Sequence, residues 1–279
     1  MSFGDLTRIN TNLQAMGALG ALQKTNSEIG LRQMRLATGL RINRAEDDSA
    51  GYTIAKKLQA RVRGQEKALS NIGDAKSMLT VAEGGLNTVM DILQTMKEKT
   101  VQAANDTLGT EERDAIESEL DALSAEITDT LTNATFNGTS LFSATGAVSL
   151  TFQVNAEQGD TFTTSISSIS VTNMSVTDGD LVVDTATNAS ATLGRIDNAI
   201  STVATKLASV GDSQKRLSFK QENLQVSMNN YESARSRIED ADFAKEQMEI
   251  IKLQILQQTG VAALAQANAG PQSILSLFQ

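Results

Sequence analysis

The sequence predicts a mainly α-helical protein: a long antiparallel, coiled-coil-like bundle with a small β-hairpin region and paired terminal helices. Two long stretches carry apolar residues at steps of three and four, the spacing of a coiled-coil seam. A short segment between them alternates apolar and polar residues with period two. The single proline is Pro271, so nothing upstream of it forces a helix to break.

The longer seam occupies residues 193–238. At 1.5 Å per residue this helix is roughly 70 Å long, and it has to bury its stripe against other helices. Two interpretations stay open for the polar residues in the stripe: they fix the register of the bundle, or they lie at the seam edge and reach water. The seam positions are Leu193, Ile196, Ile200, Val203, Leu207, Val210, Gln214, Leu217, Gln221, Leu224, Met228, Tyr231, Arg235 and Ile238.

A second seam runs through residues 58–96, and we expect its helix to continue through Gly84 and Gly85 although each glycine costs roughly 1 kcal/mol. A shorter third helix is expected with Thr110 as its N-cap, before the acidic pair Glu111 and Glu112. Three stripes in one chain favour a bundle of antiparallel helices. The second stripe is Leu58, Val62, Gln65, Leu69, Ile72, Ala75, Leu79, Ala82, Leu86, Val89, Leu93 and Met96, and the third is Ile116, Leu120, Leu123, Ile127 and Leu131.

The β-rich segment covers residues 139–186, with a hairpin turn expected at 155–160. These patterns divide the chain into three parts. A terminal helical domain takes residues 1–44 and 236–279, the long bundle takes 45–138 and 187–235, and the β-rich tip takes 139–186. The period-two positions are Val148, Leu150, Phe152 and Val154, then Met174 with Val176, and Leu181 with Val183.

Both chain ends carry wide apolar faces. Residues 248–256 are apolar on nearly all sides, yet too polar to cross a membrane. Two paired helices cover only one face of each other, so the remaining apolar surface favours association with further copies of the same pair. The residues expected to mediate this self-assembly are Leu6, Ile9, Leu13, Met16, Leu19, Leu22, Met248, Ile250, Ile251, Leu253, Ile255, Leu256, Leu264, Ile274 and Leu277.

A polar segment, LATGLRINRAEDDSAG at residues 36–51, separates two helical stretches. It is either a solvated linker with screened charges or a contact segment that fixes the register between neighbouring subunits. Gly39 and Gly51 permit unusual backbone angles there. In the second interpretation the inter-subunit polar contacts come from Arg41, Asn43, Arg44, Glu46, Asp47 and Asp48.

Composition excludes several classes of function. The net charge of −9 argues against nucleic acid as a partner and against docking on anionic lipid. The chain has no Cys and no His, which removes Cys or His nucleophiles and zinc sites built on them. No catalytic motif occurs, so we expect neither an enzyme nor a cofactor or metal. The first residues do not resemble a secretory signal, so we expect any export to use another route.

Two stretches carry a family resemblance. Residues 36–58, LATGLRINRAEDDSAGYTIAKKL, closely resemble the N-terminal signature of bacterial flagellins. Residues 236–278, SRIEDADFAKEQMEIIKLQILQQTGVAALAQANAGPQSILSLF, resemble their C-terminal signature. The resemblance covers about the first 140 and the last 90 residues. Its short middle suggests a compact flagellin without large outer domains.

The resemblance implies a structural subunit that polymerises with itself into the extracellular flagellar filament, used for swimming. The terminal helices would form an inner tube, and the long bundle an outer tube. Type III export, an export chaperone, the filament cap protein and hook-junction proteins are implied as partners, with neither nucleic acid nor membrane insertion. The alternatives are a hook–filament junction protein of the same family or, in another class, a membrane-active amphipathic translocator.

One stretch departs from the family pattern. In many flagellins the segment matching LQTMKEKTVQ, residues 93–102, carries an Arg and a Leu that a vertebrate innate receptor recognises. Here those positions hold Thr95 and Lys99. We therefore expect weak activation of that receptor.

Overall fold

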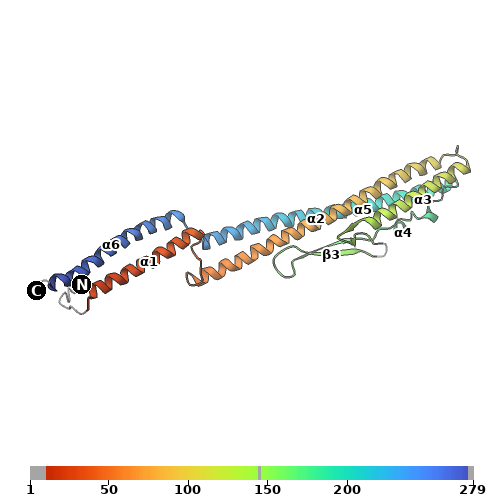
Figure 1. Cartoon of the computed structure of the whole chain (residues 1–279). Coiled ribbons are helices and arrows are strands. Elements are labelled where there is room, and N and C mark those ends of the chain that lie inside the picture. The colour runs from red at the N-terminus through yellow and green to blue at the C-terminus, as the bar shows by residue number, and fades with distance from the viewer. Residues whose placement is uncertain (1–10, 144–145, 276–279) are drawn as a thin grey trace. The chain divides into compact units, whose positions relative to one another are not determined.

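The computed structural model describes the backbone of residues 11–143 and 146–275, and the side chains up to residue 269. The chain forms two compact units. One unites the chain ends, up to residue 60 and from residue 230, and the other comprises residues 61–229. The described part is mainly helical, as predicted (Figure 1). The two long helices α2 (Ser49–Ala103) and α5 (Ala186–Glu239) each contribute residues to both units.

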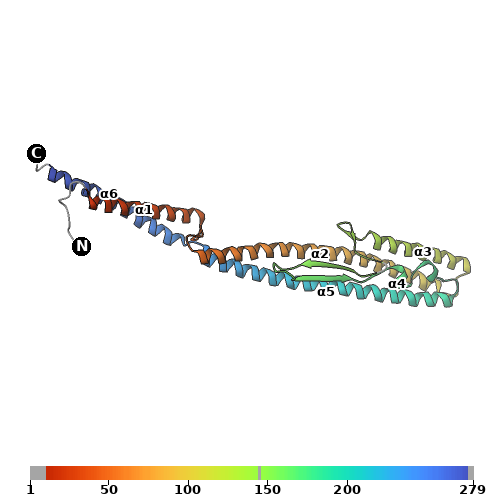
Figure 2. The same ribbon diagram turned by 90° about the horizontal axis from the view of Figure 1, so that it is seen from below.

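In the unit of the chain ends, α1 (Leu13–Thr38) and α6 (Phe243–Leu275) lie side by side in both views (Figure 1 and Figure 2). They run antiparallel, because Asn12 contacts Ala267 while Arg32 contacts Glu246. The side chain of Asn12 also caps α1, and Gly39 ends the helix with a φ of 72°, the left-handed conformation that glycine adopts at low cost.

In the unit of residues 61–229, the two predicted seams face each other. Gln65 donates to Ser227 and Gln214 donates to Glu83, which fixes an antiparallel register of α2 against α5. Apart from the exposed Gln221, the seam positions of this unit are buried or half-buried, with Leu79, Leu86 and Leu93 wholly enclosed. Helix α2 continues through Gly84 and Gly85 as predicted. A Cβ at Gly85 would lie 3.3 Å from the Phe142 ring, so the glycine allows close packing there.

The third helix, α3 (Thr110–Asn133), buries its predicted stripe except for the half-buried Leu123, but it begins differently from the prediction. Gly109 is the N-cap, without a side-chain hydrogen bond, and Thr110 is the first helical residue. The expected Thr110 cap is therefore wrong. The carboxylate of Glu112 folds back over Gly109, so a side chain at the cap position would meet it. The acidic residues in the first turn still stabilise the N-terminus of α3, where the helix dipole is positive.

The strands β3 (Val148–Gln153) and β4 (Thr161–Ile166) form an antiparallel hairpin around the predicted turn. The sequence analysis did not identify a second, smaller hairpin, β1 (Thr135–Phe136) with β2 (Thr139–Ser140). Its turn residues Asn137 and Gly138 both have positive φ, the conformation that an Asn-Gly pair favours.

The expected strand character near Met174 and Leu181 is wrong. The chain there forms a short helix, α4 (Val171–Met174), and a 3-10 turn, η1 (Asp178–Asp180), although the apolar side chains are buried. Neighbouring helices supply the backbone partners that a strand would otherwise provide. Those bonds run from Ser124 to the Val176 carbonyl, from Thr192 to the Val182 carbonyl, and from the Val183 amide to Glu117.

Candidate self-assembly surface

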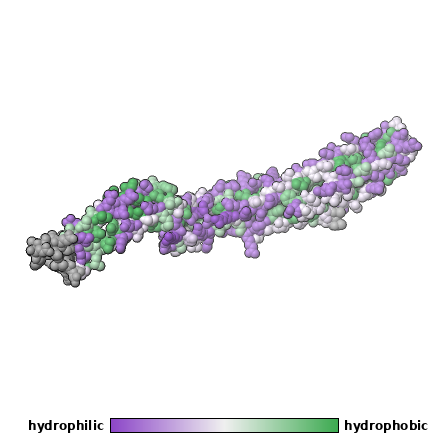
Figure 3. Space-filling model, in the orientation of Figure 1, coloured by the Kyte–Doolittle hydropathy of each residue, from purple (hydrophilic) through white to green (hydrophobic). Residues whose placement is uncertain are grey.

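Helix α6 carries apolar residues on more sides than α1 covers. Ile250 and Leu253 are buried, each 5% exposed, whereas Met248 is 65% and Ile255 is 56% exposed. Hydrophobic side chains are visible on the surface of the α1–α6 pair (Figure 3). Phe243, at the start of α6, is also exposed; we call the exposed residues farther along the helix, Met248, Ile251, Ile255, Leu256 and Val261, the α6 outer face.

Helix α1 divides in the same way. Ile29 is buried and Leu22 is half-buried, with its Cδ1 3.5 Å from the position of a Cβ on Gly260 of α6. Leu13, Met16 and Leu19, in contrast, are exposed. The N-terminal half of α1 therefore presents apolar residues to solvent.

The structure thus separates the residues predicted for self-assembly into two sets. One set contributes to the α1–α6 pair: Leu22, Ile250, Leu253 and the half-buried Leu264. The other set is exposed: Leu13, Met16, Leu19, Met248, Ile251, Ile255 and Leu256. Leu6, Ile9 and Leu277 lie outside the described residues, as does the side chain of Ile274.

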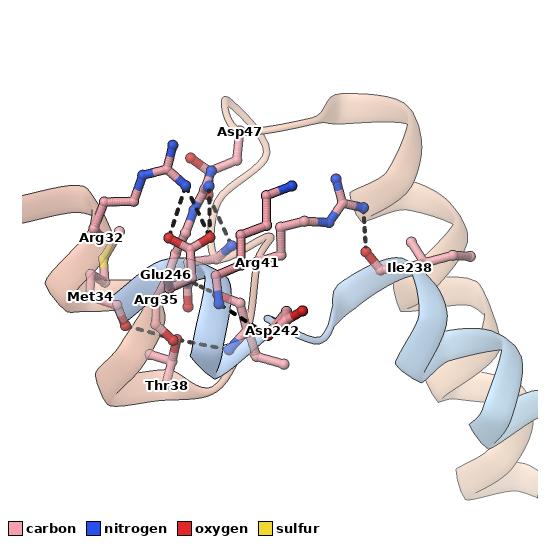
Figure 4. A network of polar contacts seen from close by, with 12 residues as sticks. Arg32, Met34, Arg35, Thr38, Arg41, Asp47, Ile238, Asp242 and Glu246 are labelled. Carbon is pink, nitrogen blue, oxygen red and sulfur yellow. Dashed lines mark hydrogen bonds and ion pairs between the residues drawn. The ribbon is translucent and has the colours of Figure 1, made fainter. Parts of the chain in front are cut away.

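A buried carboxylate fixes the register of the α1–α6 pair (Figure 4). Glu246 accepts hydrogen bonds at 3.0 and 2.8 Å from Nη1 of Arg32, and Arg35 lies 3.6 Å away. Asp242 caps α6 through the amides of Ala244 and Lys245. Because a buried charge without its partners is costly, sliding the helices by one turn is strongly disfavoured.

Sequence analysis missed this ion cluster. Arg32 and Arg35 are three residues apart and therefore share a face of α1, which was the available signal. Their partner is more than 200 residues away in sequence, and no local pattern identifies which of the C-terminal carboxylates faces them.

The polar segment after α1 is held by main-chain bonds to the segment before α6. The amide of Arg41 donates to the Glu239 carbonyl at 2.6 Å, and the amide of Ala241 donates to the Gly39 carbonyl at 2.8 Å. The guanidinium of Arg41 also donates to the Ile238 carbonyl (Figure 4). The two links between helices therefore form one short antiparallel bridge.

The carboxylates of this segment turn the chain into α2. Asp47 accepts from the amides of Asn43 and Arg44, and these backbone hydrogen bonds lower the pKa of the Asp47 carboxyl. Asp48 accepts from the Gly51 amide in the first turn of α2. Arg44 and Glu46 form an exposed ion pair, and Arg41 is also exposed, whereas the other members of the predicted contact segment are half-buried.

The described residues contain no cluster of three or more His, Cys, Asp or Glu side chains suited to a metal ion. None of the helices in this described part qualifies as a membrane-spanning segment.

Two family models match the chain: the bacterial flagellin N-terminal helical region over residues 9–147, and the C-terminal helical region over residues 193–278. Flagellin FlaB1 of Treponema pallidum is 34% identical, over 97% of this chain and 99% of that protein. The flagellin of Bacillus subtilis is 36% identical, over 98% of this chain and 100% of that protein. A structure described as a flagellar hook-associated protein of Vibrio parahaemolyticus shares the fold, with a TM-score of 0.59 at 16% identity, over 70% of this chain and 100% of that one.

Paired terminal helices, a long helical hairpin and family matches at both ends define a structural protein of the bacterial flagellum. The chain belongs to the bacterial flagellin family. It is a subunit of the extracellular flagellar filament, in which flagellins polymerise, and it is not an enzyme. The matched relatives are covered almost end to end, which confirms the compact form. They are flagellins, which favours the filament subunit over the junction-protein and translocator alternatives.

Proposed function

We propose that the α6 outer face and the exposed residues of α1 form the surface through which subunits of this chain assemble. The observation that carries the proposal is the contrast within α6, where Ile250 and Leu253 are covered by α1 but Ile251 and Ile255 are not. Apolar surface contributes roughly 25 cal/mol per Å2 when it leaves water. In a protein that polymerises, neighbouring subunits can bury this exposed apolar surface.

The same surface accounts for an open polymer. The chain presents unlike faces, the apolar helix pair and the polar bridge with Arg44 and Glu46, and in this proposal each contact between two subunits joins different surfaces. Such heterologous contacts repeat without closing and produce a helical filament. In this proposal residues 1–44 and 236–279 form the inner tube and residues 45–138 with 187–235 form the outer tube, with residues 139–186 as the β-rich tip of the bundle.

The test compares two double substitutions in the full-length chain. Ile251→Asp with Ile255→Asp places charge on the α6 outer face, whereas Gln221→Asp with Gln225→Asp adds the same charge at exposed polar positions on α5. We expect the isoleucine variant to stay monomeric when seeded with filament fragments, and the glutamine variant to elongate them in electron micrographs. Elongation by the isoleucine variant would contradict the proposal.

A truncation gives the largest version of this test. Deletion of residues 248–279 removes the α6 outer face and also the buried Ile250 and Leu253, and we expect a soluble helical bundle that never forms filaments. Circular dichroism monitors the remaining helices and electron microscopy monitors the polymer. Filaments from the truncated chain would refute the assignment.

We propose that the same surface also binds the partner proteins of export and assembly. Before assembly, the α6 outer face needs cover, which suits an export chaperone; at the filament tip and base, the cap protein and the hook-junction proteins would meet it. We expect chaperone binding to protect Met248 from oxidation, because that side chain is 65% exposed in the free chain. Unchanged oxidation in the complex would place the chaperone elsewhere.

The innate-receptor stretch belongs to α2. Thr95 is exposed and bonded to its own helix, and the Lys99 ammonium lies 2.7 Å from Glu119 of α3. We propose that this chain activates the receptor weakly and that Thr95→Arg with Lys99→Leu raises the response. A reporter-cell assay with depolymerised protein measures both; a strong response from the unsubstituted chain contradicts the proposal.

A further inference from the structure

An apolar hollow of about 180 Å3 lies between the end of α3, the strand β2 and the start of α4. Leu131, Phe142 and Ile169 line it and are themselves almost wholly buried. Thr132 and Ser170 also line the hollow, and Thr132 is exposed. An apolar concavity of this size accepts one large side chain.

A large apolar side chain protrudes from α5 in the same unit. Phe219 is 55% exposed, whereas the seam residues Leu217 and Leu224 beside it are buried. At about 100° per residue Phe219 lies roughly 200° around the helix from Leu217, so it points away from α2. Val226, seven residues later, is exposed on the same face.

Phe219 does not fill the hollow of its own chain. Lys76 donates to Gln221, which places this turn of α5 beside residue 76 of α2. Phe142 instead packs at Gly85, roughly 13 Å farther along α2 at 1.5 Å per residue. The protruding ring and the hollow are therefore separate, unlike surfaces of one unit.

We propose that Phe219 of one subunit enters this hollow on a neighbouring copy of the chain in the filament. Charge supports the pairing: Lys215 is exposed one turn before Phe219, and the exposed Asp129 lies between Thr128 and Thr132, which line the hollow. Lys215 and Asp129 form no ion pair with another described residue. A ring in an unlike pocket is a heterologous contact, which an open polymer can repeat indefinitely. This contact lies on residues 61–229 and is additional to the terminal helices.

The chain contains no Trp, so Phe219→Trp makes a single fluorescent reporter of the contact. On seeded polymerisation we expect a blue shift of its emission and a several-fold loss of acrylamide quenching. Adding Thr132→Arg at the mouth of the hollow should abolish both changes or prevent assembly. The matched control is Ser118→Arg, because Ser118 is also an exposed α3 hydroxyl bonded four residues back, but it does not line the hollow.

Two outcomes overturn the proposal: filaments in which the Trp emission stays that of the monomer, or equal effects of Thr132→Arg and Ser118→Arg. These outcomes differ from failure of the terminal-helix proposal, which concerns whether filaments form when α6 is altered.

A second measurement applies even if the Trp chain does not assemble. The chain has no Cys, so a chain with Phe219→Cys and a differently tagged chain with Thr132→Cys each carry one thiol. Any disulfide between the two tags must therefore join two molecules. We expect mixed dimers after mild oxidation of copolymerised filaments, and few when Ser118→Cys replaces Thr132→Cys. Copolymers, or equimolar mixtures if no polymer forms, that yield no excess of mixed dimers over the Ser118 control overturn the proposal.

Discussion

The seam between α2 and α5 and the surface of α6 contain similar apolar residues but differ in how much of that apolar surface the single chain buries. From residue 203 to residue 224, every seventh residue of α5 is buried. These side chains face α2, which packs against α5 along the seam. On α6 the apolar positions follow each other too closely for one stripe, so α1 buries Ile250 and Leu253 while Ile251 and Ile255 stay exposed. A strict heptad spacing needs one partner helix, whereas an all-round apolar helix needs several.

This difference separates the stability of the single chain from the stability of the polymer. Residues buried in the seam contribute to the folding of a lone subunit, since they are removed from water there. Residues on the α6 outer face contribute little until another molecule covers them. The same substitution chemistry should therefore give opposite patterns in the two regions.

The largest predicted effect contrasts two truncations to alanine. Leu93→Ala empties a fully buried seam position and should cost about 2–5 kcal/mol of unfolding free energy in the monomer. Ile255→Ala should change monomer stability by less than about 0.5 kcal/mol, since that side chain is exposed. Urea unfolding followed by circular dichroism measures both. The critical concentration for polymerisation should rise several-fold for Ile255→Ala. Equal losses of monomer stability would break the contrast.

The next effect concerns the ion cluster of the α1–α6 pair. Glu246→Ala leaves Arg32 and Arg35 without their shared carboxylate, and we expect a loss of about 3 kcal/mol in the stability of this helix pair. Glu249→Ala is the control, because that carboxylate pairs with the exposed Lys252 on its own helix. Amide hydrogen exchange of α1 should rise in the first variant only. Equal exchange in both would remove the register role of Glu246.

The long helices were predictable from sequence because their period is a local property. The seam spacing carried α2 through Gly84 and Gly85, where propensity alone would have broken it. The segment around Val176 and Val183 was not predictable, because its backbone bonds go to Ser124 and Glu117 of α3 and not to a strand. The alternating burial in this segment arises because an irregular stretch of chain packs against helices.

A smaller effect concerns the ionisation of a half-buried carboxyl group in the unit of residues 61–229. Burial raises the pKa of the Asp121 carboxyl to about 6, and the hydrogen bond and charge of Asp178 add to the rise. Because the folded-state pKa is above the unfolded value of 3.8, stability should increase as pH falls from 7 through 6 towards 4. Asp121→Asn should stabilise the monomer at pH 7 by about 1 kcal/mol, allowing for partial solvation, and flatten this dependence.

Thermal unfolding between pH 5 and pH 7 measures this effect. Asp129→Asn, an exposed carboxylate on the same helix, is the control and should leave the pH dependence in place. If Asp121→Asn keeps the full pH dependence, another carboxylate is responsible.

The candidate surface was only partly predictable. The apolar composition of residues 248–256 identified α6 as a helix with too little cover, but which residues face α1 depends on the register that Glu246 sets with Arg32. Asn43, Asp47 and Asp48 were interpreted as inter-subunit contacts or solvated charges. In the structure their side chains bond to backbone groups within their own segment, which holds the turn between α1 and α2.

The smallest effect distinguishes two polar residues of the α5 seam. Gln214 is half-buried and donates to Glu83 at 2.8 Å, whereas Gln221 is exposed and accepts from Lys76 at 3.3 Å. Gln214→Ala should cost about 1 kcal/mol, and Gln221→Ala less than about 0.5 kcal/mol. A double-mutant cycle of Gln214→Ala with Glu83→Ala isolates the coupling from the lost packing. If coupling is absent, Gln214 is a seam-edge residue like Gln221 and does not contribute to the register of α2 against α5.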